Sequence, residues 1–373
     1  MYAGGKFMKE NEKRIIGRVL FIFALVCLIG GLYTLGNILG TDASYSVPLE
    51  PGETVDSAPE DVPSEAIAMP EDAYTPVRLT FAGSCTAGSM LGSDSYGTFN
   101  ALLAENGAAY FLETLVPVLG TDDLTVAGCD VVLSDEEEMT AAEGRGEWYR
   151  GPSEAARIFA DGGVDALSLH SFHPWDYGAE GYEDTKSALE HAGLLWGDHG
   201  KAVYYEKAGI SVAVYCRYVD DVSDADNILA WLADAAEHDY IALYITTPET
   251  EADLPEEARR TMFRAFAEAG ADLVAATDTV RIQPCERWGD SMILYSTGAL
   301  LNGRTKYPES YTLLCGVELQ VVDGEIRKTD YTVTPCRTYD DDHAWHPQEL
   351  KNAEESAAVM DFLNGNRETP YLD

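Results

Sequence analysis

The residues best suited to chemistry lie in the run HSFHPWDYG, which follows an apolar segment. His173 and Asp176 stand close together in it, and an imidazole beside a carboxylate suits acid–base catalysis or metal binding. The plainer interpretation leaves His173 hydrogen-bonded inside a loop and Asp176 capping the turn before Tyr177 and Gly178. We therefore treat both residues as candidate catalytic groups.

Two further stretches carry polar or aromatic side chains of interest. The acidic run DEEE at 135–138 suits a hard cation, although such runs also form solvated faces. In GEWYRGP, Trp148, Tyr149 and Arg150 are candidates for stacking on a ligand, or for packing a loop onto a sheet. The sequence contains no GxSxG elbow, P-loop, HExxH or GxGxxG motif, so none of those site classes is indicated.

The elements that must position these residues alternate along the chain. Apolar runs predict strands over 77–83, 129–134, 164–171, 210–218, 240–246, 271–276 and 291–297. Helical periodicity predicts helices over 99–120, 153–163 (with Ser153 as N-cap), 182–193 and 255–270. A hairpin turning at Asp323-Gly324 and a closing helix over 352–366 follow. This alternation predicts an α/β fold, a layered sandwich with helices on both faces of the sheet. Site residues are then expected at the carboxyl ends of strands.

The N-terminus has the composition of a membrane anchor. Residues 1–18 hold five Lys or Arg against two Glu, and residues 19–40 hold no charge. A helix over 19–40 would be about 33 Å long, enough for a hydrocarbon core of about 30 Å. The basic flank predicts a cytoplasmic N-terminus, a single-pass signal-anchor and an extracytoplasmic remainder in the cell membrane. A cleaved signal peptide is the competing interpretation.

Residues 41–75 hold nine acidic residues, five prolines and no Lys or Arg, which predicts an extended acidic linker. The whole chain has a formal net charge of −39, which argues against nucleic acid as a partner. Six cysteines lie beyond the predicted anchor without any CxxC spacing. We expect them to be buried small apolar side chains, although an even number also permits disulfides.

The order of these segments resembles the CapA-type family, which is linked to capsule and poly-γ-glutamate synthesis. The family opens with a strand ending in Gly-Asp, where this chain has LTFAGS, and its Ala-Asn-Asn-His-x-x-Asp-Tyr-Gly signature aligns with HSFHPWDYG. Its D-x-x-x-x-N-x-E segment aligns with Asp130, Asp135 and Glu137, and its Tyr-Ser-Leu-Gly-Asn step with YSTGA. The resemblance runs from Val77 to Thr338. It implies a metallophosphatase-like fold for 76–338, with 339–373 as a C-terminal extension.

This chain departs from the family where the resemblance implies metal ligands. The departures are Ser84 for the Asp, Phe172 for an Asn, Thr246 for a His, and Asp278 and Val280 for a His-x-His pair. Phe and Val offer no lone pair, and a hydroxyl is a weak donor beside a carboxylate or imidazole. We therefore expect no two-metal centre and no cofactor. The alternative is one divalent metal ion in a remodelled site. Its remnant ligands would be Asp135, Glu137, His173 and Asp278.

The resemblance implies a protein of capsule or poly-γ-glutamate-type envelope polymer synthesis or export, and the predicted anchor over 19–40 makes it membrane-anchored. With its site degenerate, the chain is expected to be a non-catalytic binding or scaffold member, a pseudoenzyme. Its expected partners are the membrane, through the N-terminal helix, and other envelope polymer-synthesis proteins. The alternative is a metal-dependent, phosphoesterase-like hydrolase with a remodelled ion site.

Overall fold

The computed structural model describes residues 73–93, 98–144, 146–220, 224–248, 252–277, 281–304, 311–339 and 344–372. The expected cytoplasmic segment 1–18, the anchor 19–40 and nearly all of the linker 41–75 lie outside these residues. Among the residues that are described, no helix is both long and apolar enough to cross a membrane.

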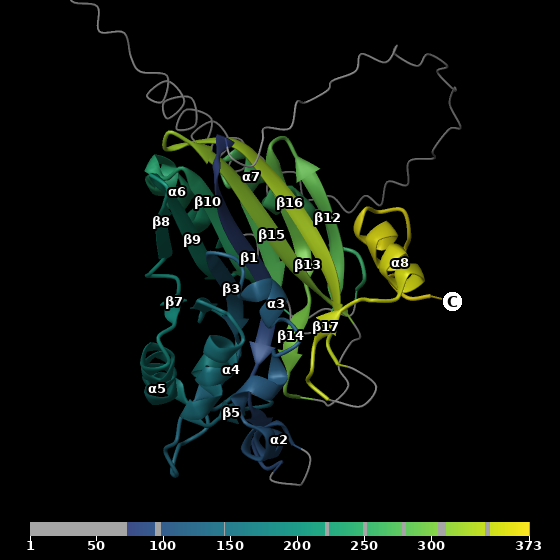
Figure 1. Ribbon diagram of the computed structural model, residues 1–373. Coiled ribbons are helices and arrows are strands. Elements are labelled where there is room, and N and C mark those ends of the chain that lie inside the picture. The colour runs from purple at the N-terminus through teal and green to yellow at the C-terminus, as the bar shows by residue number, and fades with distance from the viewer. Residues whose placement is uncertain are drawn as a thin grey trace, which may run out of the picture. The chain divides into compact units, whose positions relative to one another are not determined.

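The first of two large sheets has the strand order β17-β16-β15-β1-β3-β6-β7, with β14 also paired to β1. Strands β14, β1, β3, β6 and β7 run parallel, and β15, β16 and β17 extend the sheet antiparallel. Figure 1 shows β1 between β15 and β3. The strands are β1 (Thr75–Thr86), β3 (Leu124–Cys129), β6 (Ala166–Ser168), β7 (Leu195–Gly197), β14 (Ala299–Asn302), β15 (Tyr311–Val322), β16 (Glu325–Arg337) and β17 (Gln348–Glu349).

The second sheet has the order β12-β13-β11-β10-β9-β8, parallel except at its two edges. Its strands are β8 (Val203–Lys207), β9 (Ile210–Tyr218), β10 (Tyr240–Thr246), β11 (Leu273–Thr277), β12 (Ile282–Trp288) and β13 (Ser291–Thr297). A small third sheet is formed by β2 (Ser89–Met90), β5 (Tyr149–Gly151) and β4 (Val132–Leu133).

The two large sheets bury one face of each against the other. Phe81 and Val126 of the first sheet share an apolar cluster with Val214 and Leu294 of the second. The Tyr244 hydroxyl crosses this core to donate to the carbonyl of Ala82 at 2.9 Å. This packing explains the apolar runs of the strands, because each central strand is covered on both sides.

Helices cover the outer faces. On the first sheet lie α2 (Phe99–Asn106), α3 (Val116–Leu119), α4 (Ala156–Asp161) and α5 (Gly178–His191), together with the 3₁₀ segments η2 (Ala108–Phe111) and η3 (Ser153–Ala155). On the second lie α6 (Ala225–Asp234), which η6 (Ala235–Glu237) continues, and α7 (Glu257–Glu268). Phe263 of α7 stacks on Tyr295 of β13, and Trp231 of α6 stacks on Tyr215 of β9. The expected α/β sandwich is confirmed, but two sheets share the core where the sequence pattern suggested one.

Two predicted helices are wrong in their extent. The segment 99–120 breaks at Gly107, whose φ of 79° ends α2. Over 153–163 the chain begins as a 3₁₀ turn, and Ser153 does not cap it. Ser153 instead donates its backbone N–H and its hydroxyl to the carboxylate of Asp135.

The C-terminal part is tied to the sheets. The predicted hairpin forms between β15 and β16, with positive φ at Asp323 and Gly324. The closing helix is α8 (Ala353–Leu363), and the side chain of Asn352 caps it by accepting from Glu354 N and Glu355 N. Buried Glu355 accepts from the Tyr311 hydroxyl at 2.8 Å, which fastens α8 to β15 (Figure 1).

The six cysteines beyond residue 72 carry free thiols, and all but Cys285 are buried. Burial raises the pKa of Cys85 to about 12 and that of Cys285 to about 11. The expectation of buried apolar cysteines is confirmed for five of the six, and their thiols are protonated near neutral pH.

Three carboxylates gather where β3 begins. Burial raises the pKa of Asp122 to about 6, even though the Thr125 hydroxyl donates to its carboxylate at 2.7 Å. The negative charges of Asp165 and Asp123 raise it further. The folded state therefore holds the Asp122 proton more tightly than the unfolded chain does.

Replacing Asp122 by asparagine is expected to stabilise the protein near pH 7 and to change little near pH 4. Because the folded pKa of about 6 exceeds the ordinary 3.8, the wild-type protein gains stability as pH falls through 6 toward 4. The variant lacks the charge that disfavours folding at pH 7, and partial solvent exposure limits the gain to about 1 kcal/mol. Urea denaturation at both pH values measures it, with Asp290→Asn on an exposed turn as control. An equal gain at pH 4 and pH 7 would show that the buried charge of Asp122 is not the cause.

Candidate functional site

Asp130 fastens the loop after β6 to the end of β3. This fully buried carboxylate accepts the backbone N–H of His173 at 2.9 Å, and also the hydroxyl of Ser171. The Asp130 N–H donates to the carbonyl of Cys85 on the neighbouring strand β1 at 2.8 Å. Asp130 thus joins the carboxyl ends of β1 and β3 to the loop HSFHPWDYG after β6, which we call the signature loop.

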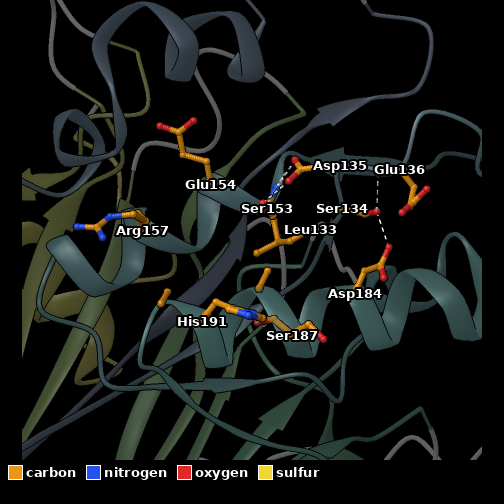
Figure 2. Close-up of a pocket in the computed structure, with 12 residues that line it drawn as sticks. Leu133, Ser134, Asp135, Glu136, Ser153, Glu154, Arg157, Asp184, Ser187 and His191 are labelled. Atoms are coloured by element: carbon orange, nitrogen blue, oxygen red, sulfur yellow. Dashed lines mark hydrogen bonds between the residues drawn. The ribbon is translucent and has the colours of Figure 1, made fainter.

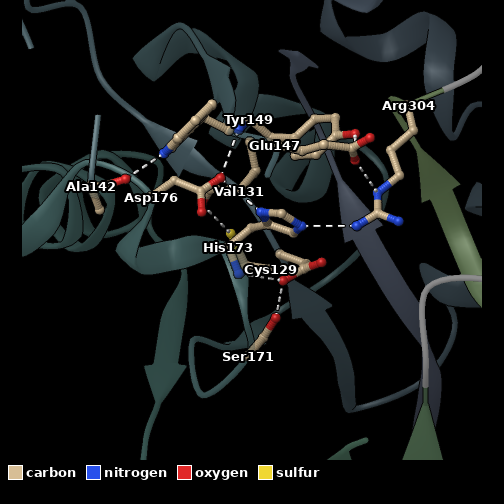
Figure 3. Close-up of polar contacts among 11 residues, drawn as sticks. Cys129, Val131, Ala142, Glu147, Tyr149, Ser171, His173, Asp176 and Arg304 are labelled. Atoms are coloured by element: carbon tan, nitrogen blue, oxygen red, sulfur yellow. Dashed lines mark hydrogen bonds and ion pairs between the residues drawn. The ribbon is translucent and has the colours of Figure 1, made fainter. Parts of the chain in front are cut away.

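His173 and Asp176 form a buried pair within this loop. His173 begins the 3₁₀ segment η4 (His173–Trp175), and Asp176 is its C-cap. The Asp176 carboxylate accepts from His173 Nδ1 at 2.7 Å and from the Tyr149 backbone N–H at 2.7 Å (Figure 3). The two side chains are 2% and 0% exposed, so both bonds are shielded from water. The backbone N–H of Asp176 caps η4 by donating to the His173 carbonyl, and its carboxylate orients the imidazole.

The second ring nitrogen of His173 meets Arg304, which follows β14. Arg304 Nη2 lies 2.9 Å from His173 Nε2, and the guanidinium carbon lies 5.2 Å from the centre of the Tyr149 ring. Figure 3 shows the imidazole between Asp176 on one side and Arg304 on the other. Because an arginine only donates hydrogen bonds, Nε2 must accept, which places the ring hydrogen on Nδ1, facing Asp176.

Hydroxyl groups occupy the strand ends opposite this loop. The Ser84 N–H donates to Thr277 Oγ1 at 3.0 Å, and Thr246 is paired with Thr277 between β10 and β11. The hydroxyl oxygens of Ser84 and Thr246 are buried and have no hydrogen-bond partner among the described residues. The structure thus brings Ser84 and Thr246 to the same strand ends as Asp130 and the His173 loop.

The strand predicted over 129–134 is wrong, because the central strand lies earlier in the sequence. The strand next to β1 is β3, which ends at Cys129, and residues 132–133 form the short β4 of the small sheet. Along β3, the D-x-x-x-x-N-x-E spacing falls on Asp123, Gly128 and Asp130. A Cβ on Gly128 would stand 3.0 Å from the Tyr244 hydroxyl, so tyrosine fills the space of a side chain at the Asn position.

Asp135 and Glu137 are not grouped with His173 as metal ligands among the described residues. Both are exposed, and the Ser153 hydroxyl and backbone N–H hold the pKa of Asp135 below its ordinary value. Figure 2 shows Asp135 turned toward Ser153 at the rim of an open pocket of about 430 Å³. His173 does not line that pocket. Asp278 and Val280 lie outside the described residues.

The residues at the strand ends do not fit a two-metal centre. Across the described ranges, no group of three or more His, Cys, Asp or Glu side chains is placed to hold a metal ion. Ser84 and Gly128 stand where a carboxylate and an amide are implied, and Phe172 is 48% exposed with no donor atom. His173 is oriented by a carboxylate as metal-binding histidines are. However, its other nitrogen already accepts a hydrogen bond from a cation.

Within the WYR run, Tyr149 packs against this histidine. Tyr149 is buried, its ring stands edge-on to His173 at 4.7 Å, and its hydroxyl donates to Glu147 at 2.6 Å. Trp148 Nε1 donates to the Ala142 carbonyl at 2.8 Å, and Arg150 Nη1 to the Glu136 carbonyl at 2.8 Å. The contacts of Trp148 and Arg150 tie the start of β5 to the segment 136–142. A role of Trp148, Tyr149 and Arg150 in stacking on a ligand stays a prediction.

Sequence reasoning misassigned one residue of this site and missed another. Asp130 carried a signal but was aligned with the Asp of the family segment, whereas its spacing from Asp123 puts it at the Glu position. Arg304 carried none, since it lies 131 residues from His173 and outside every motif.

Comparison with known proteins decides the family. Residues 78–304, more than half of the chain, match the family described as "Bacterial capsule synthesis protein PGA_cap". This chain belongs to the PGA_cap family. The resemblance to the CapA-type family is thereby confirmed, and the matched residues run from β1 to Arg304.

Individual relatives of this PGA_cap chain are distant. The "PGA biosynthesis protein CapA" of Bacillus subtilis (strain 168) is 22% identical over 252 residues, covering 61% of this chain and 66% of that protein, just under two thirds of its length. The crystal structure of a hypothetical protein from Thermus thermophilus is similar at 14% identity and a TM-score of 0.40, covering 69% of this chain and 99% of that one. The family assignment rests on the match over 78–304.

Proposed function

We propose that this chain is a non-catalytic, membrane-anchored member of the PGA_cap family. Its extracytoplasmic domain would act by binding during synthesis or export of a capsule or poly-γ-glutamate-type polymer. The family description and the name of the Bacillus subtilis relative support a role in capsule or poly-γ-glutamate synthesis. The uncharged run over 19–40 supports the membrane anchor.

The contact between Arg304 and His173 carries the non-catalytic part of the proposal. The lone pair of His173 Nε2, which would face an ion, is engaged at 2.9 Å by a permanent cation. A divalent ion at that nitrogen would have to displace the guanidinium and overcome its charge. Neighbouring strand ends supply hydroxyl groups from Ser84 and Thr246, which hold hard divalent ions weakly.

The overall charge limits how a polyanion can bind. With a net charge of −39, the protein repels an acidic polymer at long range. Salt screens this repulsion over a Debye length of about 8 to 10 Å near physiological ionic strength. Binding of such a polymer therefore needs local cationic contacts or a partner protein.

Metal content and hydrolysis test the proposal on the full-length protein in detergent. We expect no bound Mn²⁺ or Zn²⁺ after desalting and no turnover of a phosphodiester such as bis(p-nitrophenyl) phosphate with either ion. His173→Ala and His191→Ala, a matched exposed histidine, should behave alike in both assays. Stoichiometric metal, with turnover lost in His173→Ala and kept in His191→Ala, would instead establish the hydrolase.

A further inference from the structure

We infer that Arg304 and the Tyr149 hydroxyl form a carboxylate-binding cradle, which Glu147 occupies in the free protein and a carboxylate of an acidic polypeptide takes over. The inference rests on the proposed binding function and names the chemistry of its ligand. The cradle lies beside His173, where Tyr149 at the start of β5 approaches Arg304 after β14 (Figure 3).

The guanidinium is held in place before any ligand arrives. His173 Nε2 fixes one edge of Arg304, and the Tyr149 ring lies 5.2 Å from the guanidinium carbon. Asp176 in turn holds the imidazole, so the arginine ends a chain of fixed groups. A cation fixed in this way loses little conformational freedom on binding, which favours affinity. Its side chain is 22% exposed and can be reached from solvent.

The chain's own Glu147 shows which ligand chemistry this place accepts. One oxygen, Oε2, accepts from the Tyr149 hydroxyl at 2.6 Å and lies 4.0 Å from Arg304 Nε. The second distance is too long for a direct hydrogen bond, so the ion pair is loose. The Glu147 side chain is 51% exposed and can leave without unpacking the core.

An incoming carboxylate can make both contacts that Glu147 makes. The planar guanidinium suits a carboxylate because two N–H groups can point at its two oxygens. Tyr149 as a whole is 1% exposed, and its hydroxyl supplies a further donor when Glu147 moves away. Glu147 then acts as an internal competitor, which weakens binding until a ligand of higher local concentration displaces it.

The test measures binding of a fluorescent γ-linked decaglutamate to the full-length protein in detergent, by anisotropy. Arg304→Gln should weaken binding about tenfold or more, because a charge-assisted contact is lost. Glu147→Gln should tighten it about threefold to tenfold, because the competing charge is removed. Arg327→Gln, which removes an exposed arginine paired with Glu325 at 2.8 Å, should change nothing. Thermal melts check that each variant is folded.

The opposite signs of the two main effects keep the test decisive even if Arg304→Gln folds poorly. Unchanged binding in Glu147→Gln, or in folded Arg304→Gln, would overturn the cradle while leaving a binding function in place. Pyrophosphate competing as well as unlabelled decaglutamate would overturn the assignment to carboxylates. Failure of the proposed function shows differently, as bound metal with turnover in the hydrolysis assay.

Discussion

Replacing Gly83 by alanine is expected to destabilise the protein by about 3 kcal/mol or more. A Cβ at this position would lie 2.3 Å from the carbonyl oxygen of Gly298 and 2.9 Å from the backbone nitrogen of Leu300. Both atoms belong to the main chain, so relief requires β1 and β14 to separate. The adjacent Ser84 N–H would also move away from Thr277 Oγ1, which it now reaches at 3.0 Å.

Gly316 provides the matched control, since it lies on β15, which pairs with β1. A Cβ there would meet its nearest atoms at 3.8 and 3.9 Å, which is ordinary contact. Gly316→Ala should therefore change the free energy of unfolding by less than about 1 kcal/mol. Urea denaturation followed by tryptophan fluorescence compares the two variants. If Gly83→Ala were as stable as Gly316→Ala, close approach of β14 to β1 would not explain this glycine.

Replacing Asp176 by alanine is expected to cost about 3 to 5 kcal/mol of stability. One carboxylate oxygen accepts from both His173 Nδ1 and the Tyr149 N–H, each at 2.7 Å. Alanine would leave two buried donors without an acceptor, and each such group costs about 1 to 3 kcal/mol. The same change frees the His173 ring and so removes the support beneath Arg304.

Asparagine separates the acceptor role of Asp176 from its charge. Asp176→Asn keeps an oxygen that can accept both bonds, so we expect a loss of only about 1 to 2 kcal/mol. Asp161→Ala breaks an exposed pair with Arg157 and should cost less than about 1 kcal/mol. The same denaturation measurement ranks the three variants. Equal losses in Asp176→Ala and Asp176→Asn would show that charge, and not hydrogen bonding, holds the loop.

The strands were predictable where apolar runs are bounded by turn residues. The predictions over 210–218, 240–246 and 291–297 match β9, β10 and β13 to the residue. The prediction over 129–134 failed. The apolar residues VVL have the pattern of a central strand, but the strand there, β4, pairs only in the small sheet. Apolar content reports burial, and burial alone does not say which sheet a strand joins.

The amino-acid sequence by itself determined the family motifs, the alternation of strands and helices, and the closeness of His173 and Asp176. Each of these depends on residues only a few positions apart. Only the tertiary structure decided that Asp130 pins the signature loop and that Arg304 faces His173 Nε2. The physical reason is sequence separation. Asp130 and His173 are 43 positions apart and His173 and Arg304 are 131 positions apart, and hydrogen bonds over such separations leave no periodic pattern in the sequence. They exist only because parallel strands bring their carboxyl ends to one edge.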